Sequence, residues 1–327
     1  MSEASLPIVA LSTGDPAGIG PELCMKAALS SDVLAICRPV IYSDPEVLAC
    51  HVDACAMDIE LDGYNAVSDI NWPSSRVKFI KLDLFNENKF TLGKINGENG
   101  RASIKCGTAA IKAAIEGDVQ AVVAAPHTEK SIHLAGIEFD GYPSFVARET
   151  GMMTDDVYLM VCFDKFRIAH CTLHSSVRRS LELITKDRVC RVIDAVNQTL
   201  VSIGIDCPKI LVAGLNPHAS EGGLFGNEEK DIIEPAIASK RLEGISVDGP
   251  IAADLMLHAK GYDAFIVMLH DQGHIPAKLL AKHRTAGLSI GSPILFSSVA
   301  HGSALDIAGK GIAEPTAVVE AIKHLIG

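Results

Sequence analysis

The sequence predicts an α/β fold, because short apolar segments alternate with segments that have helical patterns. The apolar segments have the length and composition of strands that are buried on both faces of a mostly parallel sheet. We expect strands at residues 7–12, 77–82, 121–125, 157–163, 166–172, 209–213 and 264–269.

Four segments between these strands have helical features. Pro21 suits the first turn of a helix ending near Ser30, where an amide would have no helical partner. Residues 102–116 are rich in alanine, with apolar residues at helical spacing, and residues 186–203 and 315–326 are amphipathic. The polar segment 85–100 is rich in glycine and asparagine and is predicted to be a loop.

Length and composition limit the class of protein. A chain of 327 residues predicts two domains. The 29 basic residues against 40 acidic ones give a net charge of −11, which argues against a nucleic-acid partner. No apolar run approaches the roughly 20 residues of a membrane span, and the N-terminus has no targeting pattern. The nine cysteines form no CxxC pair, which favours reduced thiols. We therefore expect a cytoplasmic protein that acts on a small molecule.

Three histidines follow strand-like segments. His174, His218 and His270 each lie at or just beyond the end of such a segment. Ligands of α/β sheets gather at the carboxyl ends of strands. Three imidazoles that leave an open position suit a catalytic divalent metal ion, whereas a single histidine is more often a hydrogen-bonded structural residue.

Two aspartates and a lysine accompany these histidines. Asp254 and Asp271 are candidates for contacts with the substrate or with a metal ligand, and helix capping is the alternative for each. Lys278 lies one to two turns into the helix that follows His270 and would point along the same cleft, unless it belongs to a solvated face.

Two glycine-rich segments stand out. Residues 14–22, GDPAGIGPE, follow a predicted strand and allow either a close backbone approach to a ligand or a tight structural turn. They do not form GxGxxG, so we do not predict a Rossmann dinucleotide site there. Residues 301–311, HGSALDIAGKG, carry His301 and Asp306, which could hydrogen-bond a purine or a ribose.

Together these motifs resemble the 4-hydroxythreonine-4-phosphate dehydrogenase family, which has an isocitrate/isopropylmalate dehydrogenase-like fold. Residues 14–22 match its GDPxGIGPE opening, residues 216–219 its NPHA sequence and residues 270–273 its HDQG motif. Residues 301–307 are similar to the adenine-binding HGSAxDI loop of isopropylmalate dehydrogenases. The resemblance runs from about residue 7 to the end of the chain.

The resemblance implies a homodimer of subunits with two α/β/α domains, and an active site in the interdomain and dimer cleft. The approximate domains are 1–125 with 285–327, and 126–284 with the metal histidines and dimer contacts. It implies oxidation of a secondary alcohol by NAD, followed by decarboxylation. The base is left open between Lys278, an aspartate and a metal-bound hydroxide. The implied metal ligands are His174, His218 and His270, and the implied NAD contacts are His301, Gly302, Ser303, Ala304 and Asp306.

The predicted substrate pocket departs from the family pattern. Tyr142 and Pro143 replace a phosphate-binding His-Thr pair, and Phe296 replaces a phosphate-binding arginine. A phosphate dianion needs cationic or N–H donors, so these residues favour a ring without phosphate. The GYPS sequence at 141–144 is similar to the terephthalate dihydrodiol dehydrogenase branch.

We therefore predict oxidation with decarboxylation of a carboxylated cis-dihydrodiol, with substrate contacts at Tyr142, Pro143, Phe296 and Lys278. One alternative is a dehydrogenase of 4-hydroxythreonine-4-phosphate or a related phosphorylated four-carbon hydroxy acid. Others are a metal-dependent hydrolase or lyase without NAD, and a non-catalytic binding module. The metal is not distinguished between zinc, cobalt, nickel and manganese.

Overall fold

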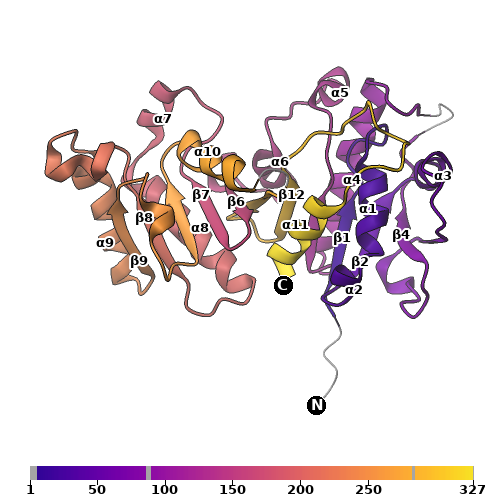
Figure 1. Ribbon diagram of the computed structural model, residues 1–327, viewed down its shortest axis with the longest axis horizontal. Helices are drawn as coiled ribbons and strands as arrows, with labels where there is room; N and C mark the ends of the chain where they lie inside the picture. Colours follow the sequence, from indigo (N-terminus) through magenta and orange to yellow (C-terminus); the bar gives the residue numbers. More distant parts are fainter. Residues whose placement is uncertain (1–5, 86–89, 282–283, 327) are drawn as a thin grey trace, which may run out of the picture. The chain divides into compact units, whose positions relative to one another are not determined.

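The computed structural model describes residues 6–85, 90–281 and 284–326 (Figure 1). The chain divides into two compact units. Unit 1 comprises Met1–Gly151 and Pro293–Gly327, and unit 2 comprises Met152–Ser292. Each unit contains a sheet and several helices, which confirms the predicted α/β class.

Unit 1 contains a parallel sheet with the strand order β3-β4-β2-β1-β5-β12. β1 is buried from Val9 to Ser12, as expected of an apolar strand between parallel neighbours. Because all these strands run in the same direction, their carboxyl ends share one edge. The strands are β1 (Ile8–Ser12), β2 (Arg38–Ser43), β3 (Leu61–Tyr64), β4 (Val77–Lys81), β5 (Ala121–Ala124) and β12 (Leu295–Val299).

The helices of unit 1 carry the start signals that their sequences suggest. Pro21 lies in the first turn of α1, and the Asp44 side chain caps α3 by accepting a hydrogen bond from the amide of Glu46. The helices are α1 (Gly20–Ala28), α2 (Ser31–Leu34), α3 (Pro45–Ala54), α4 (Gly97–Ile115), α5 (Glu129–Leu134), α6 (Tyr142–Glu149) and α11 (Thr316–Ile326), with a 3₁₀ turn at Val67–Asp69.

One part of the predicted loop at 85–100 is helical. α4 begins at Gly97, five residues before the predicted start at Ala102, because the Asn96 side chain accepts a hydrogen bond from the amide of Asn99 at 2.8 Å. This cap offsets the poor helix propensity of the glycines in the first turn. Residues 86–89 of the same segment lie outside the described residues.

Unit 2 contains a mixed sheet with the strand order β11-β6-β7-β10-β8-β9. β7, β10, β8 and β9 are parallel, whereas β6 pairs antiparallel with both β7 and β11. The turn between β6 and β7 uses Asp164 in a left-handed conformation. The strands are β6 (Tyr158–Phe163), β7 (Phe166–His170), β8 (Lys209–Ala213), β9 (Ser246–Ile251), β10 (Ala264–Val267) and β11 (Ala286–Ile290).

The longer helices of unit 2 follow its strands. They are α7 (Val177–Leu183), α8 (Lys186–Ser202), α9 (Glu234–Leu242) and α10 (His270–Ala281). Shorter helical segments occur at Thr154–Asp156, Pro217–Gly223, Glu229–Ile233 and Met256–His258. Within the described ranges, no helix is both long and apolar enough to cross a membrane.

Residues 285–292 belong to unit 2 and not to the first domain, because β11 pairs with β6. Residues 126–151 belong to unit 1, whereas the sequence-based domains grouped them with residues 152–284. The reason is packing, because α5 and α6 both lie against α4. The ring of Phe145 on α6 joins the unit 1 core with Val40, Ile80 and Phe296.

Candidate functional site

Two of the predicted metal histidines line one cavity in unit 2. The cavity has a volume of about 490 Å³ and is lined by His174, His270 and Asp271, together with three serines at 175, 176 and 180. β7 and β10 are parallel neighbours, with Val267 beside His170. The segments that follow them therefore open at the same edge of the sheet, which brings the centroids of the His174 and His270 rings to 6.1 Å.

His270 is held on two sides. Its Nδ1 lies 2.7 Å from Oδ1 of Asp271. The ring of His274, one turn further along α10, stacks on the His270 ring with centroids 3.9 Å apart and only 7° between the planes. A carboxylate on one ring nitrogen and a parallel ring on the face fix the orientation of the imidazole.

His274 is in turn held by His170, which is buried in β7. His170 Nδ1 lies 3.3 Å from the carbonyl oxygen of Leu159, so this nitrogen carries the proton. His170 Nε2 is then an acceptor, and His274 Nδ1 donates to it at 3.1 Å. The network therefore assigns one tautomer to each ring and leaves Nε2 of His274 unprotonated.

Burial keeps both supporting histidines neutral at ordinary pH. Desolvation, reinforced by the neighbouring imidazoles, lowers the pKa of His170 to about 3 and that of His274 to about 4. The packing also explains the glycine of the HDQG motif, since a Cβ atom on Gly273 would collide with Nε2 of His170. The pair of His170 and His274 was not predicted from the sequence, although His274 lies four residues after His270 and therefore on the same helical face.

His218 lies in a strained segment that follows β8. Five consecutive residues have left-handed backbone conformations: His218 (φ 54°), Ala219 (50°), Ser220 (73°), Glu221 (48°) and Gly222 (70°). Such conformations are unfavourable for residues with a Cβ atom and cluster at functional sites. The His218 ring lies 6.2 Å from that of Phe225.

The buried carboxylate of Glu229 anchors the start of this segment. Its Oε1 accepts hydrogen bonds from the amides of Leu215 and Asn216, each at 2.7 Å, and its Oε2 accepts one from Nδ2 of Asn216 at 2.9 Å. Across the described residues, no three His, Cys, Asp or Glu side chains gather closely enough to hold a metal ion. The structure thus brings His174 and His270 to one cavity, and His218 is not among the residues that line it.

The other predicted catalytic residues of unit 2 are exposed. Lys278 lies on α10 two turns beyond His270, at the i+8 position that keeps it on the face of His270 and His274. Asp254 lies in a turn between β9 and the 3₁₀ helix Met256–His258. Asp271 is engaged with His270, so its carboxylate serves first to orient that ring.

In unit 1, the two glycine-rich segments lie side by side although they are far apart in the sequence. The amide of Ile19 donates to the carbonyl oxygen of Ser303 at 2.9 Å. A Cβ atom on Gly18 would come within 2.5 Å of the Ser303 Cβ, so the contact requires glycine. The Ser303 hydroxyl lies 2.5 Å from that of Thr128. Ser303 therefore has a structural partner for its hydroxyl.

The rest of the 301–306 loop is more open. Gly302 has open space where a Cβ atom would stand, and Ala304 has a left-handed φ of 41°. Asp306 is exposed, and Nδ1 of His301 lies 3.1 Å from the carbonyl oxygen of Gly302. The loop therefore presents an exposed carboxylate and an imidazole beside open backbone.

The predicted substrate residues of unit 1 form an aromatic cluster. The Tyr142 ring lies 4.8 Å from the ring of His127, 5.6 Å from Phe139 and 5.3 Å from Phe296, measured between centroids. The Tyr142 hydroxyl donates to the carbonyl oxygen of Ala125 at 3.1 Å. Phe296 is only 1% exposed, so its ring packs against Tyr142 and the core of unit 1 and is not open to a ligand.

Two further residues complete this region. Pro143 lies in the first turn of α6, beside Tyr142. Nδ1 of His127 is buried and has no hydrogen-bond partner within the described structure, and burial lowers the pKa of this histidine to about 4. The aromatic cluster is therefore neutral as well as largely apolar.

Comparison with known proteins identifies relatives along the whole chain. A family model described as pyridoxal phosphate biosynthetic protein PdxA matches residues 35–325. The chain is 41% identical over 325 residues to a 1,2-dihydroxy-3,5-cyclohexadiene-1,4-dicarboxylate dehydrogenase from Comamonas sp, with 97% of this chain and 96% of that protein covered.

Two solved structures are also similar. A 4-hydroxythreonine-4-phosphate dehydrogenase from Klebsiella pneumoniae superposes with a TM-score of 0.89 at 31% identity, covering 99% of this chain and 98% of the other. A terephthalate 1,2-cis-dihydrodiol dehydrogenase from Burkholderia xenovorans LB400 gives a TM-score of 0.75 at 39% identity, covering 98% and 97%. Sequence identity is thus higher to the dihydrodiol enzymes.

Proposed function

This chain belongs to the family of the pyridoxal phosphate biosynthetic protein PdxA, and we propose that it oxidises and decarboxylates a carboxylated cis-dihydrodiol with NAD and a divalent metal ion. Dehydrogenase activity is common to the named relatives on both branches of the family. The named relatives differ in their substrates, so the choice of substrate depends on the residues of this chain.

The observation that carries the proposal is the aromatic cluster around Tyr142. Its ring packs on His127, Phe139 and Phe296, and its hydroxyl is bonded to a backbone carbonyl. The nearby guanidinium of Arg148 is paired with Asp140 at 3.2 Å. The aromatic rings of this cluster and its neutral imidazole would pack favourably against the face of an unsaturated substrate ring. They would give little stabilisation to a phosphate dianion.

The histidines support a metal site in part. His174 and His270 line the same cavity, and Asp271 orients His270 as carboxylates commonly do for metal-bound imidazoles. His218 would be the third ligand, and we propose that a homodimer brings the three together. A bound divalent ion would lower the pKa of the substrate hydroxyl and later polarise the ketone.

The 301–306 loop supports an adenine site. His301 and Asp306 provide polar groups, and the open backbone at Gly302 leaves room for a ligand. Bound NAD would accept the hydride released from the carbinol carbon. The loop also separates this proposal from a metal-dependent hydrolase or lyase, which has no use for a nicotinamide cofactor.

The side chains of α10 have distinct tasks in this proposal. Oxidation of the alcohol releases a hydride and a proton, and the resulting β-keto acid then loses carbon dioxide. His274 and Asp271 hold the ring of His270 in place. Lys278, on the same helical face, would take the hydroxyl proton or bind a carboxylate, and Asp254 would be the alternative base.

A second candidate function is the oxidation of 4-hydroxythreonine-4-phosphate or a related phosphorylated four-carbon hydroxy acid. The observation that favours it is the fold, because the 4-hydroxythreonine-4-phosphate dehydrogenase structure superposes with the higher TM-score. In that case a cation outside the aromatic cluster would bind the phosphate. Lys130, in the first turn of α5, is one such residue.

Substitution of the histidines tests the chemistry of the site. We expect His174→Ala and His270→Ala each to reduce both bound metal and NADH formation from terephthalate dihydrodiol at least hundredfold. The matched control is His258→Ala, which removes an exposed histidine from the same unit and should leave both unchanged. Full activity of His174→Ala with unchanged metal content would overturn the proposed metal role.

A further inference from the structure

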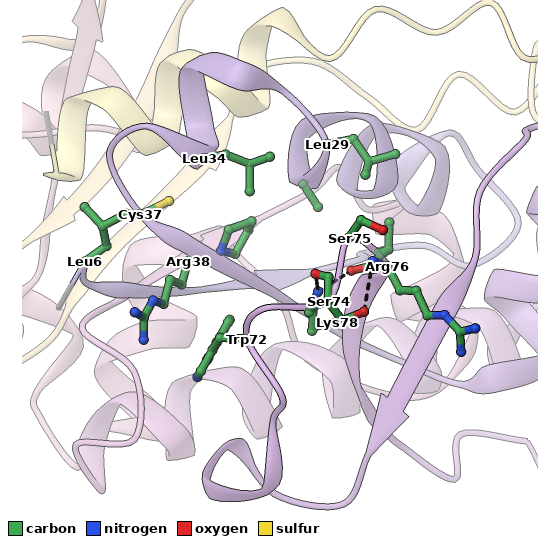
Figure 2. A pocket seen from close by; sticks show the side chains of 13 residues that line it. Leu6, Leu29, Leu34, Cys37, Arg38, Trp72, Ser74, Ser75, Arg76 and Lys78 are labelled. Atoms are coloured by element: carbon green, nitrogen blue, oxygen red, sulfur yellow. Dashed lines mark hydrogen bonds between the residues drawn. The ribbon is translucent and has the colours of Figure 1, made fainter.

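A second cavity lies in unit 1, away from the groups discussed above (Figure 2). Its volume is about 160 Å³. It is bounded by the end of α1, by the residues that lead from α2 into β2, and by the segment before β4. Because β2 and β4 begin here, the cavity lies at the opposite edge of the parallel sheet from the glycine-rich segment that follows β1.

The lining of this cavity is cationic. Among the residues that the structure describes, it contains Arg38, Arg76 and Lys78 and neither aspartate nor glutamate. The chain as a whole carries a net charge of −11, so this local excess of positive charge is unusual for the molecule. A lining that holds cations and no carboxylate favours an anionic ligand.

Arg38 is the cation that is available to such a ligand. Arg76 is paired with Glu60 at 2.6 Å, whereas the Arg38 side chain has no ion pair or hydrogen bond within the described chain. The Arg38 guanidinium instead lies over the ring of Trp72, 5.5 Å from its centroid. This stacking holds the guanidinium while its N–H donors remain free to bind a carboxylate in the bidentate geometry that arginine favours.

The rim of the cavity is fixed before any ligand binds. The ammonium of Lys78 donates to the carbonyl oxygens of Ser74 and Arg76, the latter at 2.7 Å, and the Arg76 amide donates to the Ser74 hydroxyl at 3.2 Å. Figure 2 shows the contacts of Lys78 as dashed lines. A preformed rim lowers the entropy lost on binding.

The remaining walls are apolar and partly uncovered. Leu6, Leu29 and Leu34 are 38%, 39% and 49% exposed, and Trp72 presents its ring from the other side. An apolar protein cavity of about 150 Å³ can hold one benzene molecule, so this cavity has the size of a single six-membered ring.

We propose that this cavity binds a monocyclic aromatic carboxylate, with its ring between the leucines and Trp72 and its carboxylate on Arg38. The ring size follows from the volume, the charge from the cationic lining, and the orientation from the free donors of Arg38. The site is separate from the histidine cavity of unit 2, and its existence does not depend on the reaction proposed above.

The chain offers a specific probe of this site, because Trp72 is its only tryptophan. We expect benzoate, added to the full-length protein, to change the tryptophan emission along a saturable curve. Arg38→Gln should raise the concentration of benzoate at half-saturation at least tenfold, since the charged partner is lost. Benzamide, which has the same ring without the charge, should bind at least tenfold more weakly than benzoate.

Two controls make the result decisive. Arg241→Gln removes an exposed arginine from unit 2 and should leave the benzoate curve unchanged. Acetate, which has the charge without the ring, should give no saturable change. The proposal is overturned if benzoate gives no saturable change in emission, or if Arg38→Gln and wild type give the same half-saturation.

Discussion

The imidazole of His274 lies parallel to that of His270, with centroids 3.9 Å apart and 7° between the planes. His274 cannot turn away easily, because its Nδ1 donates to the buried His170 at 3.1 Å. The buried strand β7 therefore controls the orientation of His270 through one intervening ring. His270 lines the cavity that we propose as the reaction site, so this stack links the core of unit 2 to that cavity.

The first prediction concerns this stack. His274→Leu removes both the parallel ring and the hydrogen bond to His170, and we expect kcat/KM to fall about tenfold or more, as is usual when the residue that orients a metal ligand is lost. His274→Phe restores a ring without the hydrogen bond and should recover part of the loss. Bound metal, measured by elemental analysis, should be highest in wild type, lower in His274→Phe and lowest in His274→Leu. Equal activity of wild type and His274→Leu would show that His270 needs no such support.

The second prediction concerns pH. The pKa of His127 is about 4 in the folded protein, below the usual value of about 6.5, because the ring is desolvated. Between these values the unfolded chain binds a proton that the folded chain does not, so stability falls as the pH is lowered from about 6.5 to 4. His127→Phe removes this contribution, which we expect to reach about 3 kcal/mol at pH 4.

Urea unfolding at several pH values measures this difference. His51, His170 and His274 also have lowered pKa values, so the variant keeps part of the pH dependence. The slope of stability against pH should nevertheless be smaller in His127→Phe than in wild type. The exposed control His258→Asn should keep the wild-type slope. Identical slopes for His127→Phe and wild type would contradict the assigned burial effect.

The third prediction concerns the strained segment at His218. Glu221 is exposed and has a φ of 48°, a conformation that glycine adopts without a steric cost. Glu221→Gly should therefore stabilise the protein by up to about 1 kcal/mol. Lys105→Gly, at an exposed position inside α4, should instead cost about 1 kcal/mol. Loss of stability in Glu221→Gly, seen as a lower Tm, would argue against strain in this segment.

The fourth prediction concerns Phe296. Phe296→Arg would restore the cation of the phosphate-binding family members, but the ring is buried against Tyr142 and the core of unit 1. We expect this single change to destabilise the protein by at least about 3 kcal/mol, because it buries a charge without a partner. Phe296→Leu should cost only about 1–2 kcal/mol. A stable Phe296→Arg variant would mean that the aromatic cluster opens more easily than its packing suggests.

The sequence predicted central strands better than edge strands, for a physical reason. β1, β8 and β10 are continuous apolar segments because neighbouring strands and helices bury them. β3 and β9 lie at sheet edges and are half-exposed, and their sequences LDGY and SVDGPI contain charged residues and glycine. β11 and β12 are buried but contain small polar residues, so they do not show an apolar pattern.

The candidate site was predictable only where a residue directly follows a strand that the sequence already predicts. His174 and His270 follow strands that are parallel neighbours, and this rule correctly placed them on one cavity. The pairing of His170 with His274 joins residues 104 positions apart, and nothing local in the sequence indicates it. The burial of Phe296 likewise depends on how α6 packs against the sheet. This packing cannot be predicted from the identity of the residue at position 296.

The most direct test of the proposed function is NADH absorbance with purified, metal-supplemented protein and NAD, offered terephthalate dihydrodiol and 4-hydroxythreonine-4-phosphate in parallel. The aromatic cluster around Tyr142 predicts NADH formation with the diol, accompanied by release of carbon dioxide, and none with the phosphate ester. NADH formation with the phosphate ester alone would contradict the proposal and would show that Tyr142 and Phe296 do not exclude a phosphorylated substrate.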